Sequence, residues 1–297
     1  MTNRIIEISD TSAYVHLENG LVKVEIDGSE KASVPLEEMG VLLLSNPAVT
    51  VTNAVISGII GTGGQIVFCG KNYLPAGLVL PMEGHSSAAK NYETQVTASV
   101  PCKKRIWKDI ICQKIALQSE LLIKETGEDH GLSVLCERVK SGDPDNCEGQ
   151  AARIYWSTLF GKEFRRNRDA KDHNRYLNYA YTLLRACTAR AICSAGLHPS
   201  FGIHHHNQYD AFRLADDLME PYRIFCDLQV VEAVHSFGTG HELDRSVKGI
   251  LLNIFTMSYR VNCENFCLFD ALIKTVASFS DIIGKGEGCI VLPDNLP

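Results

Sequence analysis

A run of three histidines, residues 204–206, lies just ahead of three acidic residues, Asp216, Asp217 and Glu220. Imidazole nitrogen and carboxylate oxygen together suit a divalent ion such as Mg²⁺ or Mn²⁺. Asp217 and Glu220 are three residues apart, so on a helix their side chains would lie next to each other. An imidazole in a loop that faces carboxylates on a helix could therefore hold a divalent metal ion.

The elements around this group follow from its flanking residues. Gly196 can end a helix in the left-handed conformation, and Pro199 cannot continue one, so a loop carries the histidines. Pro221 has no N–H to donate to the carbonyl of Asp217, so the next helix should bend or stop there. That helix is predicted over 211–225 from apolar residues at spacings of three and four: Ala211, Leu214, Leu218, Tyr222 and Phe225.

Glu148 is the candidate for a third ligand. It opens a helix predicted over 148–160, which Asp145 or Asn146 would cap. Glu148 shares a face with Ala152 and Tyr155, the side expected to be buried, where an acid is unusual unless it is paired or binds a metal. A first-turn acid at the rim of the helix, stabilised by the helix dipole, is the alternative.

Each of these groups also has an interpretation without chemistry. Three consecutive histidines can form an exposed polar loop. Arg213 and Arg223 lie within one turn of the acidic residues, so the acids could instead form ion pairs on the surface of a helix. From the residue types alone, both interpretations stay open.

The charge of the chain is unevenly distributed. The formal net charge of −6 argues by itself against a nucleic-acid partner, but residues 1–100 carry five Lys and Arg against ten Asp and Glu, a net of −5. Basic residues gather beyond that point, and such faces could track phosphates or could be solvated helix surfaces. The candidates for DNA binding are Lys103, Lys104, Arg105, Lys108, Arg165, Arg166 and Arg168.

The cysteines and the apolar segments indicate a protein of the reducing cytoplasm. Eleven cysteines are scattered without a CxxC pair, which argues against disulfides and structural zinc. Cys263 and Cys267 are expected to be core thiols on one helix. Residues 39–70 carry no charge but are too polar and too rich in glycine for a membrane span, so no membrane partner is expected.

The pattern of periodicity changes along the chain and predicts an α+β protein. Strands are predicted over 3–9, 13–17, 20–26, 40–45 and 65–69, with a short helix ending at Ile60. Residues 70–90 have the composition of a linker. Further helices are predicted from 106 to near Gly127 and over 178–195, 243–260 and 264–283. A small β-rich domain, 1–85, would thus precede a larger all-helical domain, 86–297.

Four motifs in this order resemble one family closely, the CRISPR-associated integrase of spacer acquisition, which is the first-numbered Cas protein. They are EGQAARIYW (148–156), LNYAYTLLRA (177–186), GLHPSFGIHH (196–205) and FRLADDLMEPYR (212–223). VFCGKNYLPAGLVLP (67–81) and WKDIICQKIALQ (107–118) are similar to the members from type II systems. The resemblance covers nearly the whole chain.

The resemblance implies a β-sandwich N-terminal domain that dimerises and a helical catalytic domain. It implies a homodimer, two of which flank a dimer of the small ferredoxin-like Cas partner in a hetero-hexamer. It further implies contact with the type II RNA-guided nuclease and its accessory adaptation protein, in a bacterial cytoplasm.

The resemblance also assigns roles to individual residues. Glu148, His205 and Glu220 would bind Mg²⁺ or Mn²⁺, and Asp217 would be an accompanying active-site acid. The polar residues after the ligand histidine, His206 and Asn207, would contact DNA or support the ligands. His198 departs from the family, since many members have Asp there; the change is expected to affect the loop and not the metal.

The implied activity is CRISPR adaptation, in which a captured DNA fragment is inserted into the array between leader and repeat. The 3′-hydroxyl of the fragment would attack a phosphodiester in a transesterification, and with water as nucleophile the same site would nick DNA. The alternative is a non-catalytic DNA-binding scaffold whose acids are paired with Arg213 and Arg223. A hydrolase of small phosphoesters is disfavoured because the sequence has no Gly-rich phosphate loop.

Overall fold

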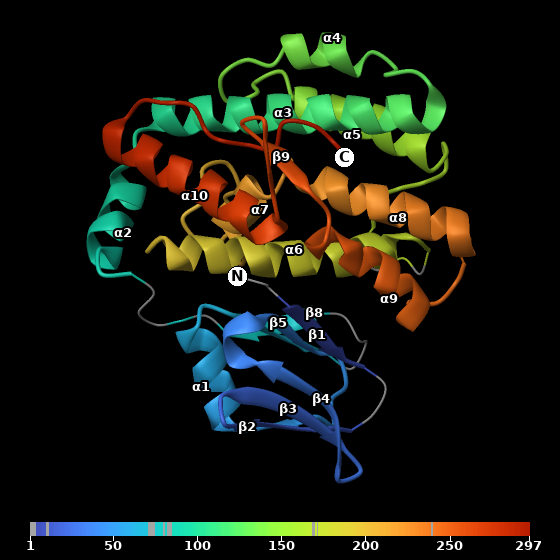
Figure 1. The fold of residues 1–297 in the computed structure, drawn as a ribbon. Coiled ribbons are helices and arrows are strands. Elements are labelled where there is room, and N and C mark those ends of the chain that lie inside the picture. Colours follow the sequence, from blue (N-terminus) through green and yellow to red (C-terminus); the bar gives the residue numbers. More distant parts are fainter. Residues whose placement is uncertain are drawn as a thin grey trace. The chain divides into compact units, whose positions relative to one another are not determined.

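Strands make up most of the N-terminal part of the chain and helices most of the rest (Figure 1). The structure, a computed structural model, describes residues 4–9, 12–70, 75–79, 81, 85–167, 170, 172–238 and 240–297. The chain divides into two compact units, Met1–Met82 and Glu83–Pro297. The predicted α+β fold is confirmed.

The N-terminal unit consists of two four-stranded sheets. In the first, β5 pairs in parallel with β1 and β7, and β8 adds antiparallel to β7. In the second, β3 pairs antiparallel with β4 and β2, and β6 adds parallel to β2. The sheet orders are β1(Arg4–Ile8), β5(Met39–Leu44), β7(Gln65–Cys69), β8(Pro75–Val79) and β4(Ser29–Pro35), β3(Leu21–Ile26), β2(Tyr14–Glu18), β6(Thr50–Val51).

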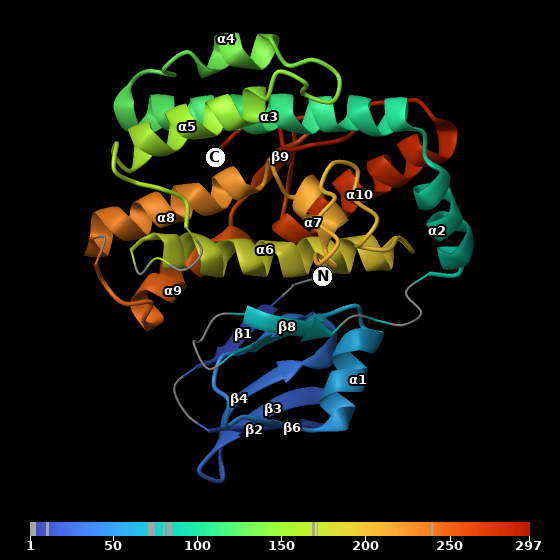
Figure 2. The same cartoon turned by 180° about the vertical axis from the view of Figure 1, so that it is seen from behind.

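The helix α1(Asn53–Gly61) lies beside the two sheets (Figure 2), and all three share one core. Val15 and Val22 from one sheet, Leu42 and Ile66 from the other, and Ile59 from α1 are all fully buried there. The uncharged run Met39–Leu44 is buried along its whole length, as expected for a strand that pairs on both sides inside such a core. The predicted β-sandwich is therefore the architecture of this unit.

The C-terminal unit is a helical assembly with one short hairpin among its described residues. Its longest helix, α3, begins after the N-cap Ser99 and ends at Gly127, whose φ of 85° is the left-handed conformation expected at the end of a helix. The helices are α2(Ala88–Thr97), α3(Val100–Thr126), α4(Leu132–Glu137), α5(Cys147–Leu159), α6(Asn174–Ser194), α7(Arg213–Leu218), α8(Arg223–Phe237), α9(Arg245–Leu251) and α10(Leu268–Lys285).

The short helix α7 lies between α3 and α6 and packs against both (Figures 1 and 2). Helix α5 runs alongside α3, and α8 packs against α3 and α6. This packing brings the loop before α7, the turn after it and the first turn of α5 toward the middle of α3. No helix of the described residues is long and apolar enough to cross a membrane.

Several local predictions were wrong or incomplete. The helix predicted over 211–225 is two helices, α7 and α8, separated by a turn that contains Pro221, as its missing N–H favours. The segment predicted as a linker, 70–90, contains β8 and the start of α2, while residues 71–74, 80 and 82–84 lie outside the described residues.

The region after α9 differs most from the prediction. Instead of one helix over 243–260, α9 gives way to a 3₁₀ turn, Leu252–Phe255, and to the hairpin of β9(Tyr259–Val261) and β10(Glu264–Phe266). Asn262 and Cys263 form its turn, with φ of 51° and 64°. A two-residue turn with positive φ at both positions matches the right-handed twist of the flanking strands. Cys263 is therefore exposed and Cys267 precedes α10, so the two are not core thiols on one helix.

Gly127 and Gly249 offer a matched test of the helix ends. Alanine at Gly127 has open space around its Cβ but must adopt a φ of 85°, so the free energy of unfolding should fall by about 1 kcal/mol. Gly249 lies inside α9, also with nothing near its Cβ and with no positive φ, so Gly249→Ala should raise that free energy by up to about 1 kcal/mol. Urea denaturation measures both; equal signs for the two variants would contradict this account.

Candidate active site

A buried lysine joins two of the predicted metal ligands. The Nζ of Lys114 lies 2.6 Å from Oε1 of Glu148 and 2.7 Å from Oε2 of Glu220. These residues come from α3, the first turn of α5 and the turn between α7 and α8, so three separate segments meet at one ammonium group. Burial alone would lower the pKa of Lys114, but Glu220 and Glu148 raise it, so the lysine is charged.

The start of α5 fixes the position of Glu148. Asn146 is the N-cap, and its side chain accepts a hydrogen bond from Gly149 N, which selects one of the two predicted caps. The carboxylate of Asp143 accepts hydrogen bonds from the backbone N–H groups of Cys147 and Glu148. The Glu148 side chain is 27% exposed. It therefore faces α3 from the first turn of its helix, partly exposed and paired with Lys114.

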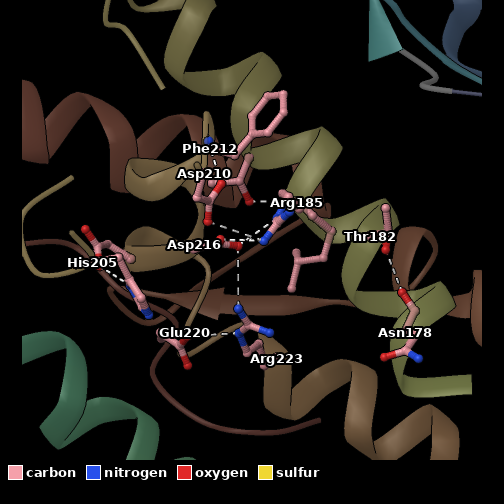
Figure 3. Close-up of polar contacts among 12 residues, drawn as sticks. Asn178, Thr182, Arg185, His205, Asp210, Phe212, Asp216, Glu220 and Arg223 are labelled. Carbon is pink, nitrogen blue, oxygen red and sulfur yellow. Dashed lines mark hydrogen bonds and ion pairs between the residues drawn. The ribbon is translucent and has the colours of Figure 1, made fainter. Parts of the chain in front are cut away.

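Glu220 is buried and balanced by two cations. Besides the Lys114 ammonium, Arg223 Nε lies 3.0 Å from Oε1 of Glu220 (Figure 3). Burial would raise the pKa of Glu220, but Arg223 and Lys114 together hold it below its usual value. Among the described residues, Oε2 of Glu220 has the close ammonium contact but no partner with the geometry of a hydrogen bond. Glu220 is thus a buried anion whose two oxygens each lie against a cation, Oε1 against Arg223 and Oε2 against Lys114.

Asp217 organises the histidine loop. Its carboxylate accepts hydrogen bonds from the backbone N–H groups of Ile203, His204 and His205, at 2.6, 3.1 and 3.2 Å, and lies 2.6 Å from Nδ1 of His205. Asp217 is fully buried, so it does not stand beside Glu220 on a helix surface as expected. A Cβ at Gly202 would lie 2.8 Å from the backbone oxygen of His205 and 3.0 Å from Oδ2 of Asp217, which explains the glycine.

The same contact orients the imidazole of His205. With Nδ1 engaged by Asp217, Nε2 is the nitrogen left to face a ligand, the arrangement typical of a histidine that binds a metal. The hydrogen bond to Asp217 raises the pKa of His205 against the opposing effect of burial, and the charges of Asp217 and Glu220 act in the same direction. Glu220 therefore lies within electrostatic range of His205.

The loop is also fastened to α3 through an aromatic stack. The rings of His204 and Trp107 lie 4.1 Å apart at an interplanar angle of 3°, and His205 meets the edge of the same indole at 5.9 Å. Burial lowers the pKa of His204, which favours the neutral ring in this stack. His204 thus supports the loop.

The remaining acid, Asp216, forms a buried ion pair. Arg185 from α6 binds it through two nitrogens, with Nε 2.7 Å from Oδ1, and Arg223 lies 3.6 Å from it (Figure 3). The acids of this group therefore do not form the surface ion pairs that were considered. Arg223 does pair with the acids, but inside the protein, and Arg213 Nε finds no hydrogen-bond partner among the described residues.

A cavity of about 200 Å³ opens beside Glu220. Asp227 borders it and accepts hydrogen bonds from the hydroxyls of Tyr155 and Tyr181, while burial raises its pKa to about 6. The lining residues are Lys114, Gln118, Ala152, Trp156, Arg166, Tyr181, Glu220, Arg223, Ile224 and Asp227. The cavity combines cationic and aromatic side chains next to the acids.

The predicted DNA-binding residues fall into three places. Arg165 and Arg166 line a second cavity of about 500 Å³ together with Arg153 and Lys162. On α3, Lys104 is exposed and Lys103 and Lys108 are half-buried, while Arg105 donates to the carbonyl of Gly286. His206 and Asn207 are exposed in the histidine loop, and Arg168 lies outside the described residues.

Lys114 and Trp107 are not among the predicted site residues, although the sequence holds a signal for the first. Lys114 lies four residues after Ile110 and three before Leu117, on the apolar stripe of α3. A lysine on a buried stripe needs an anionic partner, so its position indicates an acid elsewhere in the fold. Trp107 has no comparable signal, because a buried aromatic is typical of any core.

The donor set fits a divalent ion, although the side chains as they stand do not enclose one. Across the described residues, no three His, Cys, Asp or Glu side chains form a group that could hold a metal. The ammonium of Lys114 lies at the position that Glu148 and Glu220 would share. The carboxylates of Glu148 and Glu220, which share one cation, and Nε2 of His205 are donor types that Mg²⁺ or Mn²⁺ accepts.

Several solved structures share the fold of this chain. A casposase bound to its integration product matches 97% of the chain and 92% of its own at a TM-score of 0.78 and 16% identity. A Cas1 protein from Thermotoga maritima matches at a TM-score of 0.76 and 14% identity, over 97% of this chain and 99% of its own. At these identities the likeness establishes the fold, that of the Cas1 and casposase structures.

Two further solved structures are complexes. The Cas6-RT-Cas1–Cas2 complex matches at a TM-score of 0.76 and 19% identity over 96% of this chain and 35% of the larger one. The TtCas1–DNA complex matches at a TM-score of 0.58 and 18% identity, over 96% of this chain and 92% of the solved one.

The sequence itself establishes the family. The model of the family "CRISPR associated protein Cas1" matches residues 6–253. The CRISPR-associated endonuclease Cas1 of Neisseria meningitidis serogroup C (strain 8013) is 34% identical over 274 residues, which are 90% of this chain and 89% of the relative. The chain belongs to the Cas1 family of CRISPR-associated proteins, and its curated relatives are named as endonucleases.

The His205–Asp217 contact predicts how stability depends on pH. Because the folded state raises the pKa of His205 above its ordinary 6.5, this contact stabilises most fully below pH 6.5 and its contribution is lost as pH rises through the raised value. The effect should stay below about 1 kcal/mol, since the ring is partly exposed to solvent. In His205→Gln this pH dependence of the unfolding free energy should disappear.

His206→Gln is the matched control, since it removes a neighbouring exposed histidine. Its pH profile should follow that of the unaltered chain. A His205→Gln profile that keeps the original slope from about pH 6 to about pH 9 would show that Asp217 does not set the charge of His205.

Proposed function

We propose that the chain is a divalent-metal-dependent DNA integrase that joins captured DNA fragments to the CRISPR array by transesterification and can nick DNA. One observation carries the proposal: Glu148 and Glu220, far apart in sequence, converge on a single cation, and the oriented imidazole of His205 lies next to Glu220 (Figure 3). Acids that merely stabilised a scaffold would not require a histidine held in one orientation next to them.

The residues of the chain prepare the reaction. Mg²⁺ or Mn²⁺, when bound by Glu148, His205 and Glu220, supplies Lewis-acid polarisation of the phosphate and stabilisation of the departing oxygen. Asp217 keeps Nε2 of His205 directed to the site, and Arg223 keeps Glu220 ionised. The 3′-hydroxyl of the fragment attacks the leader–repeat phosphodiester, and one phosphodiester replaces another, so no external energy source is needed. With water as nucleophile the product is a nick.

The partners follow from the same proposal. Double-stranded DNA, both the fragment and the leader–repeat junction, would contact the cationic cavity of Arg165 and Arg166 and the face of Lys104 and Lys108. The matched Cas1–Cas2 and Cas1–DNA complexes support DNA and a Cas2 subunit as partners. Dimerisation through the N-terminal domain, the hetero-hexamer, contact with the type II nuclease and its accessory protein, and a cytoplasmic location belong to the proposal.

The rival function is a non-catalytic DNA-binding scaffold. The ion pairs of Arg223 with Glu220 and Asp216 favour it, because they neutralise the acids without a metal. The two functions differ in their need for a divalent ion.

The first test is Mn²⁺-dependent joining of a short duplex to a plasmid that bears a CRISPR array, with a Cas2 subunit present. Glu148→Ala, His205→Ala and Glu220→Ala should each lower joining at least about a hundredfold, as expected on loss of a metal ligand. Glu148→Ala should disturb the fold least of the three variants, since Glu148 is only half-buried. Asp145→Ala removes an exposed acid paired with Lys140 near the same helix start and should leave joining unchanged. Full activity of all three ligand variants, or joining without a divalent ion, would contradict the proposed metal site. DNA binding by the unaltered chain with no joining in Mn²⁺ would favour the scaffold.

A second test concerns the basic face of α3. Combined Lys104→Ala and Lys108→Ala should weaken binding of duplex DNA and make the slope of log K against log[salt] less negative by roughly 0.9 for each phosphate that the variant no longer neutralises. Lys140→Ala, another exposed lysine, is the control. An unchanged slope in the double variant would exclude this face from the DNA interface.

A further inference from the structure

Lys114 has no part in the mechanism described above, although it contacts two of the three proposed metal ligands. We infer that Lys114 is a built-in counter-cation: it holds Glu148 and Glu220 together before a divalent ion binds, and the ion must displace it. The inference rests on the proposed function, since it assigns the two glutamates to the metal.

The burial of the lysine is the first support. Its side chain is 11% exposed, and its ammonium lies within 2.7 Å of both carboxylates. A buried ammonium survives only when its charge is fully compensated, and the same holds for the 6%-exposed Glu220 carboxylate. Without a cation between them, Glu148 and Glu220 would repel each other. Lys114 therefore stabilises the fold in the absence of metal.

The balance of charge is the second support. Among the described residues, the two glutamates pair with two cations, since Lys114 binds both of them and Arg223 binds Glu220. The glutamates are thus already compensated, and a divalent ion placed on them would add two positive charges within a few ångströms of an ammonium. That repulsion is strong in a partly desolvated site, so metal binding and the present position of Lys114 exclude each other.

The structure also provides room for the displaced side chain. Lys114 lines the cavity of about 200 Å³ beside Glu220, whose other polar residues include Gln118 and the carboxylate of Asp227. The four-carbon stem of lysine can swing its ammonium without moving the backbone of α3. Lys114 is in this sense a positioning residue: it acts through the two glutamates and sets how tightly they take a divalent ion.

The test is the variant Lys114→Met in the full chain, with Mn²⁺ alone as the probe. Its thermal midpoint without metal should fall, because two carboxylates lose their shared cation. Its affinity for Mn²⁺, measured by calorimetry, should rise at least about tenfold, because the ion no longer competes with an ammonium. The stabilisation by saturating Mn²⁺ should accordingly exceed that of the unaltered chain. A residue that only supported the fold would not raise the affinity when removed.

Two further variants complete the experiment. Lys140→Met removes the same charge from the exposed pair with Asp145, also at 2.7 Å, and should change neither quantity. Lys114→Arg keeps the charge and preserves the fold even if the methionine variant does not, and its affinity for Mn²⁺ should not exceed that of the unaltered chain.

The outcomes separate this inference from the proposed function. Equal or weaker Mn²⁺ binding by Lys114→Met, or tighter binding by Lys114→Arg, would overturn the role of Lys114 while leaving the metal site in place. If the unaltered chain binds no Mn²⁺ and Glu148→Ala leaves DNA joining unchanged, the metal-dependent function is contradicted. This inference is then contradicted as well.

Discussion

The carboxylates buried on α7 and in the turn after it impose the main constraint on the helical unit. A buried carboxylate must be compensated, and each of the three is compensated by a different part of the fold. Asp216 binds Arg185 of α6, Asp217 binds the backbone of the histidine loop, and Glu220 binds Lys114 of α3 and Arg223 of α8. The helices α3, α6 and α8 are thereby fixed around a six-residue helix that could not be stable by itself. The site residues lie where these compensating contacts meet.

The sequence predicts much of this fold because hydrophobic periodicity is a local property. The strands and the long helices follow from it, and so do the caps at Asn146 and Gly127. The hairpin after α9 could not be seen, since its short strands have little periodicity and its turn uses Asn262 and Cys263 in place of a glycine. The residue types of the site were likewise readable. The burial of Asp216 and Asp217 could not be predicted. A polar residue outside an apolar stripe gives the same sequence pattern whether its side chain is solvated or pairs with an arginine distant in sequence.

His198 shows how a departure from the family pattern can be accommodated. Its Nδ1 accepts a hydrogen bond from Ser200 N at 3.2 Å, the contact that an aspartate makes to the backbone two residues ahead. Gln95 of α2 binds both the N–H and the carbonyl of the same residue. The expectation that this histidine shapes the loop and spares the metal stays a prediction, but the contact gives it a physical basis.

The stack of Trp107 on His204 has a practical consequence. The chain contains two tryptophans, and the other, Trp156, borders the cavity beside Glu220. Every indole in the protein therefore lies against this one region, one beneath the histidine loop and one at the cavity wall. The ultraviolet emission of the native chain is consequently a label-free optical reporter of whatever enters, leaves or rearranges there, with no background from remote fluorophores of the same kind.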